Sequence, residues 1–216
     1  MAAHADKAAA VERRLDGAAG EEATCSALEE AQRLVSTTAG ANAFIAKGRA
    51  SSVVKAMQKY PSSARVQMLG CRVIEMFERS FNTTAYDYSQ RLSRYQAVLT
   101  AMTSHAGPDG NHDVELLLEN GCAALLYGQS RNLVSADKSL AAVLNALRFQ
   151  KVQGKHMSSK YGGRSKGVEF LEQVIRSEAP QQGIRTVIST PDAVEQLTMA
   201  MVAQDGYELP DLQRIC

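Results

Sequence analysis

One short phrase recurs three times in the chain at a constant spacing of 45 residues. It reads SSVVKAMQK at 51–59, QAVLTAMTS at 96–104 and AAVLNALRF at 141–149. Its apolar positions fall at i, i+1, i+3 and i+4, which together form one face of an α-helix. Each copy therefore predicts a helix that buries this face. The aligned apolar residues are Val53, Val98 and Val143; Val54, Leu99 and Leu144; Ala56, Ala101 and Ala146; and Met57, Met102 and Leu147.

A second phrase alternates with the first and places a cysteine after a glycine or a threonine. It reads TCSALEEA from residue 24, GCRVIEMF from 70 and GCAALLYG from 121. Apolar residues follow at helical spacing, and the small residues allow one helix backbone to approach another closely. No basic, partly exposed setting that would make a thiol reactive is visible around them. We expect Cys25, Cys71 and Cys122 to be small apolar packing residues inside helices.

The segments between the phrases carry residues that end helices. The sequence YPSS ends the first helix and starts the next, with Ser62 or Ser63 as the N-cap, and AGPDG at 106–110 plays the same part in the second unit. Short polar segments, 84–94 and 130–138, precede the second and third copies of the first phrase. Each unit is therefore predicted to hold a short helix, a middle helix and a long third helix.

A period of about 40 to 47 residues built from two or three helices is typical of HEAT and armadillo arrays. In its period, its helix pattern and its Pro/Gly break before the third helix, the chain resembles armadillo-like repeat proteins over residues 24–149, and more loosely to 203. The resemblance implies an all-α fold, a right-handed α-solenoid of about three to four repeats in one domain. Its parts would be an N-terminal cap or degenerate repeat at 1–36, the best-defined repeats at 37–149, a basic loop at 150–167, and C-terminal helices and a tail at 168–216.

Armadillo proteins that bind extended peptides, such as importin alpha, carry a tryptophan and, four residues later, an asparagine along the third helix. The aligned positions here hold Arg72 and Met76 in one unit and Ala123 and Tyr127 in the next. The asparagines that grip a peptide backbone are missing, so we expect recognition of a folded protein surface or a helix. Met76 and Tyr127 would be apolar anchors if exposed, or packing residues between units if buried. The predicted contact residues are Arg72, Glu75, Met76, Tyr127 and Arg131.

The most basic stretch, residues 148–167, holds six lysines or arginines together with His156, and no acid. Its glycines and serines predict a loop. Such a loop offers phosphate contacts and a stacking tyrosine, which makes a nucleic-acid or phosphate-binding adaptor the alternative function. A loop that docks onto an acidic protein, or one that is only solvated, fits the same composition. Its candidate residues are Lys151, Lys155, Lys160, Tyr161, Arg164 and Lys166.

Motifs that carry chemistry do not emerge from the sequence. The stretch 109–113, DGNHD, resembles the start of a calcium loop, but Val114 and Asn120 stand where that loop needs glycine and glutamate. No Ser/His/Asp, Cys/His or paired-carboxylate arrangement is recognisable. We therefore expect no enzyme activity, no cofactor and no metal.

Charge and cysteine usage restrict the remaining classes. Lys plus Arg is 24 and Asp plus Glu is 23, so a global attraction to nucleic acid or an anionic membrane is absent. The four cysteines lie far apart, and the first residues lack the apolar core of a signal peptide, which favours a reducing, cytoplasmic compartment without membrane insertion. The leading hypothesis is a non-catalytic protein–protein interaction module, a scaffold or structural subunit of a larger assembly.

Overall fold

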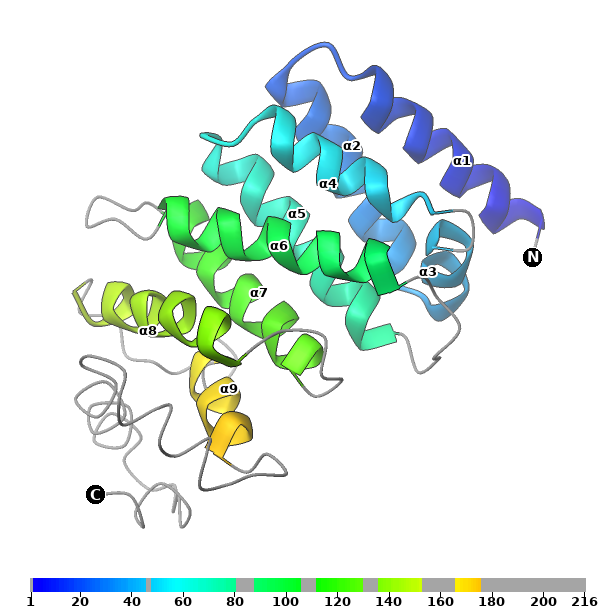
Figure 1. The fold of residues 1–216 in the computed structure, drawn as a ribbon. Helices are drawn as coiled ribbons and strands as arrows, with labels where there is room; N and C mark the ends of the chain where they lie inside the picture. The colour runs from blue at the N-terminus through cyan, green and yellow to red at the C-terminus, as the bar shows by residue number, and fades with distance from the viewer. Residues whose placement is uncertain are drawn as a thin grey trace.

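The computed structural model describes residues 2–45, 48–80, 88–105, 112–129, 136–152 and 166–175. Within these ranges every regular element is an α-helix, which confirms the predicted all-α class there (Figure 1). The helices are α1 (Ala2–Gly17), α2 (Glu21–Val35), α3 (Thr38–Ile45), α4 (Ala50–Lys59), α5 (Ala64–Ser80), α6 (Tyr88–His105), α7 (His112–Gln129), α8 (Ala136–Val152) and α9 (Lys166–Ile175).

The helices are arranged in two layers. In the first layer α1, α4, α6 and α8 contact one another in that order, and in the second layer α2, α5, α7 and α9 do the same. Contacts between the layers join α1 to α2, α4 to α5, α6 to α7 and α8 to α9, while α3 packs against α1, α2 and α5. In Figure 1, α4 and α6 lie in front of α5 and α7. The described part of the chain is therefore a row of helix pairs.

The first and second recurring phrases contact each other where a first-layer helix packs on a second-layer helix. The fourth apolar residue of the first phrase lies directly over a glycine of the next helix in the second layer. A Cβ added to these glycines would approach the facing side chain to 2.5, 2.6 and 2.8 Å, closer than such atoms come in proteins, so any larger residue would require the facing side chain to move. The third contact extends the repeat to α9, whose glycine was not part of the sequence pattern. The contacts are Met57 on Gly70, Met102 on Gly121, and Leu147 on Gly167.

The three cysteines of the second phrase lie where they were predicted, inside helices of the second layer. Cys25, Cys71 and Cys122 are free thiols, and all three are buried. Burial raises the pKa of the Cys71 thiol from its ordinary value to about 12, and it raises the pKa values of Cys25 and Cys122 as well. These thiols stay protonated and serve as small apolar packing groups.

The predicted helix break between α4 and α5 is confirmed. Residues 18–20 separate α1 from α2, and α5 begins just after Ser63. The Val66 backbone N–H donates to the Ser63 hydroxyl at 3.2 Å, which makes Ser63 the N-cap. In the first complete unit, Phe44 of α3 stacks on Phe77 of α5 with ring centroids 5.5 Å apart. The short helix α3 is thereby fixed against the long one.

The predicted three-helix unit is seen in α3, α4 and α5. In the second unit, residues 88–94 of the polar segment belong to the single helix α6 (Tyr88–His105), and residues 84–87 lie outside the described residues. Gly48, with a φ of 70°, separates α3 from α4 in the first unit, whereas residues 88–105 contain neither glycine nor proline. Residues 136–138 likewise belong to α8. Within the described ranges, the later units contribute the helix pairs α6 with α7 and α8 with α9.

Both ends of the predicted basic loop are helical. Residues 148–152 are part of α8, and residues 166 and 167 open α9. The segment 153–165 lies outside the described residues, as does the predicted C-terminal part of the chain from residue 176 onward.

Candidate functional site: the outer face of helices α5 and α7

The predicted contact residues lie on two neighbouring helices of the second layer. Arg72, Glu75 and Met76 belong to α5, and Tyr127 belongs to α7, which packs along α5. Arg131 lies outside the described residues. The described part of the predicted surface therefore spans two helices that pack against each other.

Met76 is not exposed, so it cannot be the apolar anchor that the sequence suggested. Its residue is only 5% exposed, and it belongs to the apolar core. A side chain that is already buried against its own molecule has little surface left to bury against a partner. The packing alternative therefore applies to Met76, while Tyr127 remains half-buried.

Glu75 is also buried, but it holds two arginines at the surface. Its carboxylate lies 3.1 Å from Arg72 Nη1 and 3.9 Å from Arg79 Nη1, and the side chains of Arg72, Glu75 and Arg79 are 38%, 5% and 55% exposed. We call these three residues the Glu75 cluster. Within the described part of the chain, both arginines pair with Glu75 and with no other acid, so the cluster carries one surplus positive charge.

The Glu75 cluster also contacts the neighbouring helix α7. Arg72 Nη1 lies 3.5 Å from the Asn120 amide oxygen on α7, a long but directed contact. Sequence reasoning identified Arg72 and Glu75 but missed Arg79 and Asn120. The spacing of Arg72 and Arg79, seven residues along one helix face, was the available signal for Arg79.

Arg65 continues the same stripe of α5 toward its N-terminus but is differently compensated. It forms ion pairs of 3.2 and 3.0 Å with Glu22 and Glu29 of α2. The hydrogen bond that Arg65 donates to the Glu29 carboxylate, followed by the charge of Glu22, raises the pKa of the Arg65 guanidinium. Two carboxylates thus face one arginine here, the opposite balance to that of the Glu75 cluster, and the group joins two repeat units rather than offering positive charge.

A second glutamate of α5 binds two arginines in the interior. Arg94 of α6 donates to the Glu78 carboxylate through Nε at 3.2 Å and Nη2 at 2.8 Å, and Arg91 Nη2 lies 3.7 Å from the other carboxylate oxygen. The Arg94 and Glu78 side chains are 4% and 1% exposed. This buried group fastens α6 to α5.

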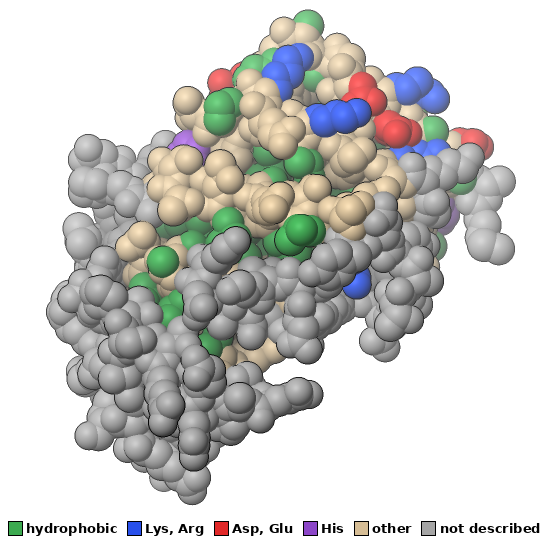
Figure 2. Space-filling view, in the orientation of Figure 1, with side chains coloured by type: hydrophobic (Ala, Val, Ile, Leu, Met, Phe, Trp, Pro, Cys, Tyr) green, Lys and Arg blue, Asp and Glu red, His purple; other side chains and the backbone are tan. Residues whose placement is uncertain are grey.

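The first layer presents a different surface. The exposed residues of α6 are uncharged, and hydroxyl and amide groups predominate among them, with Leu92 the one large apolar side chain exposed in the described ranges. Figure 2 shows this face, with few charged side chains over its centre. The exposed residues of α6 are Ser89, Gln90, Leu92, Ser93, Gln96, Thr100, Thr103 and Ser104.

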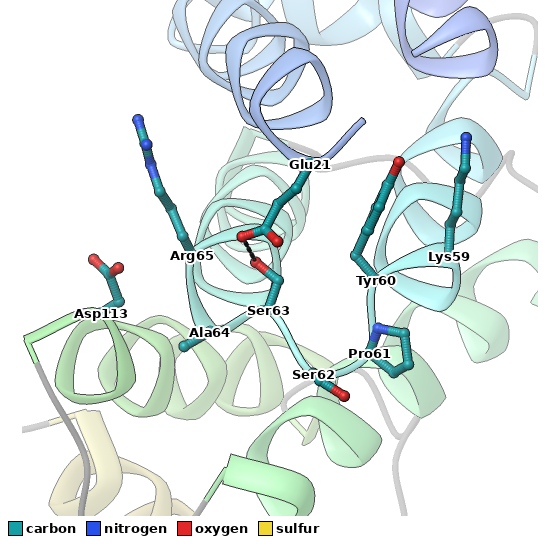
Figure 3. Close-up of a pocket in the computed structure, with 9 residues that line it drawn as sticks. All are labelled: Glu21, Lys59, Tyr60, Pro61, Ser62, Ser63, Ala64, Arg65 and Asp113. Carbon is teal, nitrogen blue, oxygen red and sulfur yellow. Dashed lines mark hydrogen bonds between the residues drawn. The ribbon is translucent and has the colours of Figure 1, made fainter. Parts of the chain in front are cut away.

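An open pocket of about 650 Å³ lies where α2, α5 and α7 begin (Figure 3). Its polar groups hold the connections between helices. The Ser63 hydroxyl donates to Glu21 at 2.6 Å, and Lys59 Nζ donates to the Ala18 carbonyl at 2.7 Å. The pocket is therefore a junction of chain segments. Its lining residues are Glu21, Lys59, Tyr60, Pro61, Ser62, Ser63, Ala64, Arg65 and Asp113.

Of the basic-loop candidates, only Lys166 has a described side chain. Its Nζ lies 2.7 Å from the Glu169 carboxylate on the next turn of α9, and its backbone N–H donates to Glu119 of α7 at 3.3 Å. Lys151 lies on α8, and nothing of its side chain is described. Lys155, Lys160, Tyr161 and Arg164 lie outside the described residues. The structure therefore brings Lys166 into the helix packing and leaves the loop prediction open.

The described residues hold neither a metal-binding cluster nor a membrane-spanning helix. No three side chains among His, Cys, Asp and Glu gather there in a way that would hold a metal ion. None of the helices there combines the length and the apolar character needed to cross a bilayer.

Comparison with known proteins adds no identification. No protein-family model, characterised protein or solved structure matches the chain significantly. The functional argument therefore rests on the residues of this chain.

Proposed function

We propose that the chain is a non-catalytic protein–protein interaction module, a scaffold or structural subunit of a larger assembly. We further propose that it folds as a short right-handed α-solenoid of three to four armadillo-like repeats. One observation carries both statements: the same side-chain-over-glycine contact joins α4 to α5, α6 to α7 and α8 to α9. A repeated contact leaves the outer face of each unit free to vary while the stack stays the same, and arrays of this kind use their extended faces for binding.

The second layer is the binding face in this proposal. It combines half-exposed arginines on α5 with the half-buried Tyr127 on α7. Arginine and tyrosine are enriched at protein interfaces because each combines a large contact area with a specific polar group. Without the asparagines that grip an extended backbone, this face suits a folded surface or a helix.

The experiment is affinity purification of the tagged chain under native conditions, with and without nuclease, followed by mass spectrometry. The proposal expects defined protein partners that remain bound after nuclease treatment. Recovery of the chain alone, or of RNA that disappears with nuclease, would contradict it and favour the adaptor that acts through residues 148–167.

A variant separates the binding face from the packing behind it. Tyr127→Ala is expected to reduce partner recovery while the folded chain keeps its melting temperature within a few degrees. Met76→Ala is the matched comparison on α5. Because Met76 is buried, its truncation should lower the free energy of unfolding by about 2 to 5 kcal/mol.

A further inference from the structure

The Glu75 cluster combines two properties at the surface: a surplus positive charge and side chains held near a buried carboxylate. Glu75 is buried, so its position is set by the packing of α5. Arg72 donates a hydrogen bond of 3.1 Å to its carboxylate and Arg79 lies 3.9 Å from it, while 38% and 55% of the two side chains remain exposed to solvent. An arginine carries five N–H donors, so a carboxylate that is shared by two arginines leaves most of these donors free for another acceptor.

The spacing of the two arginines defines what can bind them together. They lie seven residues apart on α5, which is nearly two helical turns and about 10 Å along the axis. A helix lying alongside α5 repeats its own surface positions at the same interval. Two carboxylates at positions i and i+7 of such a helix would each meet one guanidinium.

We propose that the Glu75 cluster is the docking point for an acidic helix of a partner protein, with two carboxylates seven residues apart that pair with Arg72 and Arg79. This inference rests on the proposed function and names the chemistry of the partner. Charge complementarity determines the choice of occupant, because the cluster carries one surplus positive charge whereas the neighbouring Arg65 group carries one surplus negative charge. A helix with a basic residue one heptad beyond its acidic pair would complement both groups.

Preorganisation makes the arginines effective. An exposed arginine normally loses side-chain freedom when it binds, and that loss opposes binding. Here part of this ordering is already achieved within the chain by Glu75 and, for Arg72, by the contact with Asn120. The planar guanidinium then offers a bidentate geometry to each incoming carboxylate, which a lysine cannot reproduce.

The test uses the full chain and two labelled synthetic helical peptides of identical composition. One peptide carries two glutamates seven positions apart, and the other carries them on opposite faces. Fluorescence anisotropy at low ionic strength should show tighter binding of the first peptide by about tenfold, the size expected for one charge-assisted hydrogen-bonded pair. Equal binding of the two peptides would overturn the proposal, because it would mean that only total charge matters.

Two matched variants assign the effect to the cluster. Arg79→Gln should remove the preference between the peptides, and Arg13→Gln should preserve it, since Arg13 is an exposed arginine of α1 in the other layer. Each substitution removes one exposed guanidinium, so the two variants change the net charge of the chain by the same amount. An equal loss in both variants would overturn the assignment. Displacement of the spaced peptide by inorganic phosphate at a concentration at which chloride has no effect would replace the acidic helix with a phosphate group as the ligand.

Failure here is distinguishable from failure of the proposed function. A native protein partner that survives nuclease and binds Arg72→Gln/Arg79→Gln as well as the parent chain would sink this inference and leave the interaction module intact. Absence of any protein partner would remove the proposed function itself.

Discussion

Glu75 and Glu78 lie three residues apart on α5, and each pairs with two arginines, but the two groups differ in how much of them is exposed to solvent. Glu78 and its main partner Arg94 are almost completely buried, whereas both partners of Glu75 are substantially exposed. Charges removed from water must be paired within the protein, so the Glu78 group is tied to folding. The Glu75 group retains contact with solvent, so its arginines can exchange water for a partner.

The largest expected effect tests the buried side of this comparison. Glu78→Gln leaves the buried Arg94 without its counter-charge and should lower the free energy of unfolding by about 3 to 5 kcal/mol. Glu75→Gln is the matched control on the same helix, and it should cost about 1 kcal/mol because its arginines can turn to water. Urea unfolding followed by circular dichroism measures both. Equal losses would show that exposure of the partners does not separate the two groups.

The second prediction compares the buried ion pair with the close contact between Gly121 of α7 and Met102 of α6, in terms of the free energy of unfolding. In Gly121→Ala the new Cβ would lie 2.6 Å from Met102 Cγ and Sδ, and the strain should cost about 1 to 3 kcal/mol. Gly20→Ala is the control, since an added Cβ there meets no atom within 4 Å. Adding Met102→Ala should make the glycine substitution less costly, as a double-mutant cycle would detect. A Gly121→Ala chain as stable as Gly20→Ala would contradict the close approach.

These contacts show how far the sequence could predict the fold. The 45-residue repeat and the small residue before each cysteine correctly predicted helices, buried faces and thiols that pack in the core. The repeat did not predict that α6 is one continuous helix. Its first turns look polar, and Arg91 and Arg94 are directed inward only because Glu78 of another helix meets them there. Local periodicity contains no information about such a partner.

The candidate site also shows that the sequence pattern alone does not determine which residues are exposed. Arg72 and Glu75 could be chosen from their aligned positions, but Met76 occupies an aligned position as well and is buried. Whether a residue at the edge of a helix stripe faces water depends on the neighbouring helix, here α7, and on how closely the layers pack. Arg79 was missed because it matters through Glu75, one turn away, rather than through its place in the repeat.

A third prediction concerns the titration of a buried thiol. Because burial raises the pKa of the Cys71 thiol from 9.0 to about 12, the folded state holds this proton more firmly than the unfolded state. The resulting stability is complete below pH 9 and should fall between pH 9 and 12, with a slope of up to about 1.4 kcal/mol per pH unit from this group. Unfolding free energies of the parent chain and Cys71→Ala, compared across this range, isolate the contribution. Identical dependence of the unfolding free energy on pH in the two chains would contradict the raised pKa of the Cys71 thiol.

The smallest expected effect on stability belongs to the exposed side of the comparison. Arg79→Gln removes a half-exposed guanidinium 3.9 Å from its partner, so the free energy of unfolding should change by no more than about 0.5 kcal/mol. The same urea measurement used for Glu78→Gln detects it. A loss of several kcal/mol would place Arg79 among the residues that hold the fold together.

The central claim is that one arginine–glutamate group of α5 stabilises the fold and the other binds a partner. The most direct measurement compares recovery of the native partner by the parent chain and by Arg72→Gln/Arg79→Gln, with the unfolding midpoint of each chain recorded alongside. The account predicts that the double variant loses most of its partner while its midpoint stays close to that of the parent. Full recovery of the partner by a folded double variant would contradict it.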